Sequence, residues 1–123
     1  MRLRVNVWLL VAAINGFLAV AASAFGAHGL QGRIDANTLT VFETGARYHM
    51  YHALALGLAA LSGRSGANVA AMFFLAGIVL FSGSLYVLAL TGNRALGAIT
   101  PFGGLAFLVG WACLAWAARR SAA

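Results

Sequence analysis

Four apolar segments, separated by short polar stretches, constrain the fold of this chain more than any other feature. They cover about residues 5–27, 42–62, 67–91 and 101–118. A helix needs about 20 predominantly apolar residues to cross a bilayer, and each segment approaches or exceeds that length. The connections are rich in Gly, Ser, Asn and Arg, which is typical of turns. Because short turns place successive helices antiparallel, we predict an all-α integral membrane four-helix bundle with up-down topology, forming a single transmembrane domain over residues 1–123.

The composition also indicates a lipid environment. The chain is 63% hydrophobic and 8% charged, whereas a soluble domain is about 45–50% apolar and about 25% charged. A soluble chain of this length could not hide so much apolar surface. The net charge of +6 comes from arginines scattered at the ends of the apolar segments. Nucleic-acid binding needs a clustered basic surface, so this class is excluded.

The arginines also predict the orientation, because short cytoplasmic loops of membrane proteins carry an excess of positive charge. With four spans, five arginines share the side of the two termini: Arg2, Arg4, Arg64, Arg119 and Arg120. The other side carries three arginines, partly offset by two acids: Arg33, Arg47, Arg94, Asp35 and Glu43. We therefore expect a multi-pass protein of the bacterial inner membrane with both termini in the cytoplasm.

The first segment has an alternative interpretation as a cleaved signal peptide. Arg2 and Arg4 form a basic start, and residues 22–24 (ASA) resemble a small-residue cleavage site. However, the apolar stretch is longer than the usual signal core of about 7–15 residues, and Asn15 interrupts it. We favour a retained helix.

Small residues predict how the helices pack. Lipid tails are as apolar as leucine, so membrane helices associate through close backbone approach and hydrogen bonds. The fourth segment carries a stripe of small side chains at spacings of three and four: Gly103, Ala106, Gly110, Cys113 and Ala117. We expect this stripe to face other helices, although chance alone produces some stripes in a chain so rich in Ala and Gly.

The second segment contains the most unusual stretch, RYHMYHALAL, in which ionisable groups adjoin Ala and Leu. To cross a bilayer, this helix must begin near Phe42, which places its histidines at membrane depth. At 100° per residue, Tyr48 and His52 share a face with small residues, so we predict that they point into the bundle. Glu43 and Arg47 are four residues apart and are expected to form an interfacial ion pair. His49 lies between the two faces.

An ionisable side chain at membrane depth is a candidate for function. We predict an intramembrane polar site of His28, Tyr48, His52 and Ser84. In one interpretation, His52 is a proton carrier, a quinone contact, or a haem or metal ligand. In the other, which we favour, it is a neutral histidine hydrogen-bonded to another helix. A zinc site needs about three or four protein ligands, and His49 with His52 supplies two.

The sequence also resembles a known family through four blocks: AFGAHGL, TGARYHMYHALAL, GIVLFSGSLYVLALTG and LGAITPFGGLAFLVGW. Together they resemble domain of unknown function 423, a family of small bacterial inner-membrane proteins that is similar to the eukaryotic transmembrane protein 256. The resemblance implies an integral membrane protein with four helices, and it implies no activity. Family members often carry Gln at the position of His49, which weakens a two-histidine ligand scheme and favours His52.

These observations predict a protein without catalytic, cofactor or metal sites. We expect a non-enzymatic accessory, assembly or structural component of a membrane complex, or a homo-oligomer, whose other partners are membrane lipids. One alternative is an intramembrane site for a proton, quinone, lipid or haem around His52. Another is a minimal transporter or channel, which would need paired broken helices.

Overall fold

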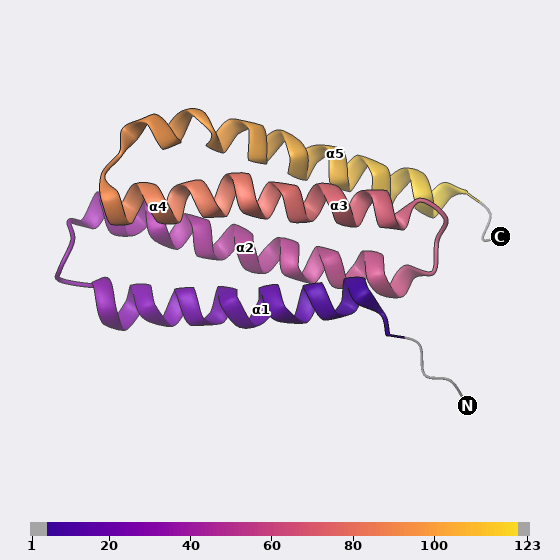
Figure 1. Ribbon diagram of the computed structural model, residues 1–123, viewed down its shortest axis with the longest axis horizontal. Coiled ribbons are helices and arrows are strands. Elements are labelled where there is room, and N and C mark those ends of the chain that lie inside the picture. The colour runs from indigo at the N-terminus through magenta and orange to yellow at the C-terminus, as the bar shows by residue number, and fades with distance from the viewer. Residues whose placement is uncertain (1–4, 121–123) are drawn as a thin grey trace.

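The computed structural model describes residues 5–120 and is all-helical, as predicted. Helix α1 (Val7–Phe25) continues into a π-helical turn (Gly26–Leu30), and α2 covers Ala36–Ser62. Helix α3 (Ala67–Gly77) passes through a second π-helical turn (Ile78–Gly83) into α4 (Ser84–Thr91). A 3-10 turn (Arg94–Ala98) then leads into α5 (Thr100–Arg119). The four resulting rods lie side by side, and successive rods run in opposite directions (Figure 1).

Both π-helical turns keep the chain helical rather than breaking it. Within residues 5–120 we therefore find no pair of broken helices of the kind that secondary transporters use at their binding sites.

Helix α2 begins at Ala36, earlier than the start near Phe42 that the sequence analysis expects. The reason is an N-cap, because Asp35 Oδ1 accepts a hydrogen bond from the Thr38 backbone N–H at 2.7 Å. This hydrogen bond from Thr38 is also the main cause that lowers the pKa of the Asp35 carboxyl. At its other end α2 stops at Gly63, whose φ of 65° is left-handed. The 27 residues of α2 span about 40 Å.

Three rods are long and apolar enough to cross a membrane: Val7–Leu30, Ala67–Thr91 and Arg94–Arg119. Helix α2 is not among them, because it carries Glu43, Arg47 and the two histidines. It has nine buried residues, as many as the α3–α4 rod and more than the three of α1 and the four of α5. Figure 1 shows α2 between α1 and the α3–α4 rod. The two histidines of this most polar helix are thus buried among the apolar helices.

Close backbone approach positions α5 against α3 and the second π-helical turn. A Cβ at Gly103 would collide with the backbone nitrogen of Phe81. A Cβ at Gly110 would lie 2.7 Å from the Phe74 ring. Of the other stripe residues, Ala117 is buried, and Ala106 and Cys113 are half-buried. The helices meet here at a distance that only the smallest side chains permit.

We therefore predict that Gly103→Ala destabilises the protein by about 1–3 kcal/mol through overpacking. The matched control is Gly104→Ala at the adjacent position, where the nearest atom to the new Cβ is a Phe81 ring carbon at 3.9 Å. Thermal unfolding in mild detergent measures both variants. Equal melting temperatures for the two would contradict the close packing of α5.

Candidate functional site

His49 is the centre of a buried hydrogen-bond chain that joins three helices. Its Nε2 lies 2.9 Å from Asn15 Oδ1 on α1, and its Nδ1 lies 2.9 Å from the Tyr86 hydroxyl on α4. Asn15 Nδ2 donates to the Val11 carbonyl at 2.8 Å, which fixes the direction of the amide. Asn15 Oδ1 therefore accepts from His49 Nε2–H, and in the neutral ring His49 Nδ1 accepts from the Tyr86 hydroxyl.

His52, one turn along α2, is also buried but faces α5. Its Nδ1–H donates to the Tyr48 carbonyl at 2.8 Å, and its Nε2 accepts from Trp111 Nε1–H at 3.1 Å. The ring stacks on Phe107, with centroids 3.5 Å apart and an interplanar angle of 6°. His52 thus carries its proton on Nδ1, whereas His49 carries its proton on Nε2. Both nitrogens of each ring are engaged, so a haem or metal would have to displace a partner.

Two serines add further hydrogen bonds between the helices. Ser82 lies in the second π-helical turn, is fully buried, and donates to the Gly45 carbonyl of α2 at 2.7 Å. Ser84 Oγ donates to the Phe81 carbonyl at 2.9 Å and lies 2.6 Å from Thr100 Oγ1 on α5. No buried side-chain nitrogen or oxygen within residues 5–120 is left without a partner. The polar groups of the interior are used to connect helices.

The structure brings together only part of the predicted polar site. His52 and Ser84 are buried, but Tyr48 is 37% exposed and its ring packs on Phe81 at a centroid distance of 5.0 Å. His28 is exposed in the first π-helical turn. Asn15 lies level with His49, and a helix rises roughly 20 Å between positions 15 and 28. His28 is therefore at the end of the rods, far from the two histidines of α2.

Sequence reasoning missed His49, Tyr86 and Trp111 as site residues. It left His49 between two faces, yet His49 and His52 are equally buried, because α2 has neighbours on several sides. One signal was present in the sequence, namely Asn15, an amide in the middle of the first apolar segment. Such a side chain needs a polar partner on another helix.

The interfacial ion pair is a correction. Glu43 and Arg47 are both exposed, and residues 5–120 contain no salt bridge. An exposed pair at this spacing gains little energy and loses side-chain freedom when it forms. The described residues also contain no cluster of three or more side chains able to hold a metal ion.

An open groove of about 420 Å³ adjoins His52 on the outer surface. Aromatic and apolar side chains from α2 and α5 line it, among them Tyr48, Tyr51, Phe107, Leu108 and Trp111. The surface of the groove is mainly apolar, so an apolar molecule lying here would meet aromatic rings and few polar atoms.

Comparison with known proteins identifies the family. The family described as "Protein of unknown function (DUF423)" matches residues 22–104. The chain belongs to this family. The UPF0382 membrane protein YwdK of Bacillus subtilis (strain 168) is 50% identical over 118 residues, which cover 92% of this chain and 96% of the relative. The UPF0382 membrane protein of Haemophilus influenzae is 42% identical over 119 residues, 94% of this chain and 96% of the relative.

The resemblance drawn from the four sequence blocks is thus confirmed, and the relatives are named membrane proteins without an activity. No solved structure matches the chain. His49, His52 and Tyr86 fall inside the residues that the DUF423 family matches.

The two hydrogen bonds of His49 predict how its substitution changes the stability of the protein. A glutamine has one donor group and one acceptor group, as the neutral imidazole has, so His49→Gln should retain most of the stability. His49→Leu leaves Asn15 Oδ1 and the Tyr86 hydroxyl without their His49 partner and should cost about 1–2 kcal/mol more. Denaturant titration in mixed micelles measures the difference. If the leucine variant is as stable as the glutamine variant, the His49 chain does not hold the helices together.

Proposed function

We propose that this DUF423 protein is a non-enzymatic, multi-pass protein of the bacterial inner membrane, built as a four-helix membrane bundle. The names of its relatives and the three long apolar rods support the membrane environment. Helix α2 provides the fourth span, because the other rods cover its two histidines. The retained first helix is part of this arrangement, since Asn15 of α1 bonds to His49.

We further propose that both termini face the cytoplasm. The start of α1, the α2–α3 turn and the end of α5 lie at one end of the rods (Figure 1). Arg64 Nη1 donates to the Arg120 carbonyl at 3.0 Å, and the Arg119 guanidinium lies 5.5 Å from the Trp116 ring. This basic end with an interfacial tryptophan is what the positive-inside rule expects on the cytoplasmic side. Arg2 and Arg4 lie outside the described residues.

The proposed role is that of an accessory, assembly or structural component of a larger membrane complex, or of a homo-oligomer. The observation that carries it is the engagement of every ring nitrogen of His49 and His52 within the chain. Acid–base or ligand chemistry would need one of these nitrogens to be available. Because these interior groups are engaged, the protein would act through its outer surface, by contact with other proteins or with further copies of itself.

One hollow in that surface is suited to another helix. It has a volume of about 550 Å³ and is lined by Ala13, Gly16 and Val20 of α1, with Met50 of α2. A Cβ added at Gly16 meets nothing within 4 Å. Small residues on an exposed helix face permit the close approach by which membrane helices associate.

We predict that Gly16→Leu weakens association without unfolding the protein. The matched control is Gly97→Leu, at a glycine whose Cβ also meets nothing within 4 Å. Native gels and crosslinking after gentle-detergent purification should show a larger assembly for the wild type and for Gly97→Leu, and a reduced one for Gly16→Leu. A wild type that purifies as a monomer with no crosslinked partner would contradict the proposed role.

A second candidate function is a small-molecule site in the groove beside His52. The observation that favours it is the row of aromatic side chains that lines the groove next to a buried histidine. Flat, apolar rings such as those of isoprenoid quinones are suited to stacking there.

We predict that a quinone would quench the fluorescence of Trp111 in a background with Trp8→Phe and Trp116→Phe. Quenching at a site saturates, and it should weaken when Gly104→Leu fills the groove, which Gly104 helps to line. Quenching that rises linearly and equally in both proteins would show only partition into the detergent or lipid.

A further inference from the structure

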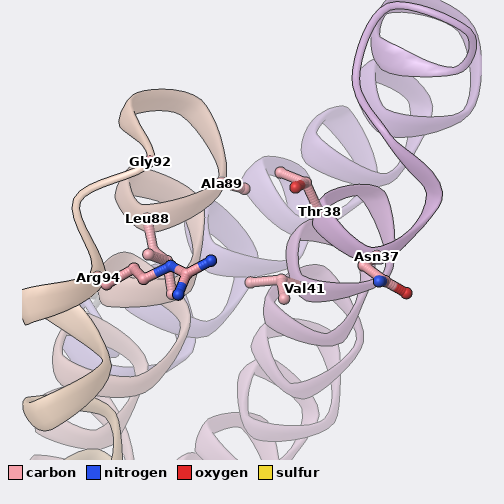
Figure 2. A pocket seen from close by; sticks show the side chains of 7 residues that line it. All are labelled: Asn37, Thr38, Val41, Leu88, Ala89, Gly92 and Arg94. Carbon is pink, nitrogen blue, oxygen red and sulfur yellow. The ribbon is translucent and has the colours of Figure 1, made fainter.

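A third hollow, a pocket of about 340 Å³, lies between the first turns of α2 and the end of α4 (Figure 2). Its lining divides by polarity. The apolar side chains are Val41, Leu88 and Ala89, and the polar ones are Asn37, Thr38 and Arg94. Figure 2 shows the Arg94 side chain extending from the loop after Gly92 across the pocket toward α2. The pocket therefore combines an apolar wall with a cationic rim.

No anion of the described chain neutralises Arg94, since residues 5–120 contain no salt bridge. The chain has two acidic residues. Asp35 accepts the capping hydrogen bond from Thr38, and Glu43 is exposed further along α2. A guanidinium that extends over a pocket without a carboxylate partner is complementary to an external anion.

The position of the pocket narrows the choice of anion, in an argument that rests on the proposed membrane arrangement. Helix α4 ends at Thr91, and Gly92 turns the chain with a φ of 74°. The apolar rod Ala67–Thr91 ends at this level, where headgroups meet the hydrocarbon core. A molecule here would have a polar group at the rim and an apolar part along Val41 and Leu88.

We propose that this pocket binds an anionic phospholipid. The guanidinium of Arg94 holds the phosphate, and the acyl chain lies against Val41 and Leu88. A zwitterionic lipid would bring its own ammonium group close to Arg94. The site therefore prefers a lipid with a net negative headgroup.

The test reconstitutes the purified protein in vesicles of equal parts phosphatidylcholine and phosphatidylglycerol, re-extracts it gently and quantifies the retained lipids. The wild type should be enriched in phosphatidylglycerol, and Arg94→Ala should lose about fivefold of that enrichment, the effect expected for one arginine at an anionic surface. Arg33→Ala is the matched control, because Arg33 is exposed in the α1–α2 connection and does not line the pocket. It should retain the preference.

Two further arms identify the source of the phosphate. Val41→Trp fills the apolar wall and should reduce lipid retention while leaving Arg94 in place. Excess soluble glycerol 3-phosphate should not displace the retained lipid. Displacement by this headgroup alone, equal losses in Arg33→Ala and Arg94→Ala, or no enrichment in the wild type would overturn the lipid site.

The membrane arrangement is checked separately in the same preparations. A protein that sediments with membranes but shows no lipid preference overturns only the lipid site. A protein that remains in the supernatant without detergent overturns both the lipid site and the proposed function.

Discussion

The hydrogen bonds that α2 makes to its neighbours are the interactions on which the rest of this structure depends. His49 joins α2 to α1 and α4, His52 joins it to α5, and Ser82 reaches it from the second π-helical turn. In an apolar surrounding an unpaired polar group is costly, so these side chains need their partners wherever α2 is buried. The same bonds that pair the buried polar groups of α2 also specify which helices lie next to it.

Close packing of α5 against its neighbours is also required for these hydrogen bonds. Trp111 can reach His52 only because α5 lies near the second π-helical turn, and Gly103 and Gly110 permit that approach. Phe107 stacks flat on the His52 ring and excludes other ligands from that face. The close packing of small residues and the polar contacts between helices therefore depend on each other in this protein. The polar groups of its interior hold the helices together. The surfaces that remain for binding other molecules are the outer surface and the pocket lined by Arg94.

The sequence predicted the helical rods well, because apolar segments and turn residues are local signals. It also contained the cap of α2, since Asp35 precedes Thr38 by three residues, but the emphasis on apolar length led to a start near Phe42. The polar contacts were harder, because they depend on which helices are neighbours. The projection of α2 as a single helix predicted that Tyr48 points into the bundle, and it assigned His49 to neither face. Only the tertiary arrangement shows that α2 has buried positions on several sides. Tyr86 and Trp111 became relevant only when their helices were placed.

The most direct test of this account is the protonation of the two rings in a lipid bilayer. Nitrogen-15 NMR of histidine-labelled protein, with His28 replaced to simplify the spectrum, distinguishes the two neutral tautomers. The account predicts opposite tautomers, with the proton on Nε2 in His49, which donates to Asn15, and on Nδ1 in His52, which donates to Tyr48. The same tautomer in both rings, or rapid exchange between tautomers in either, would show that α2 is not held by these bonds.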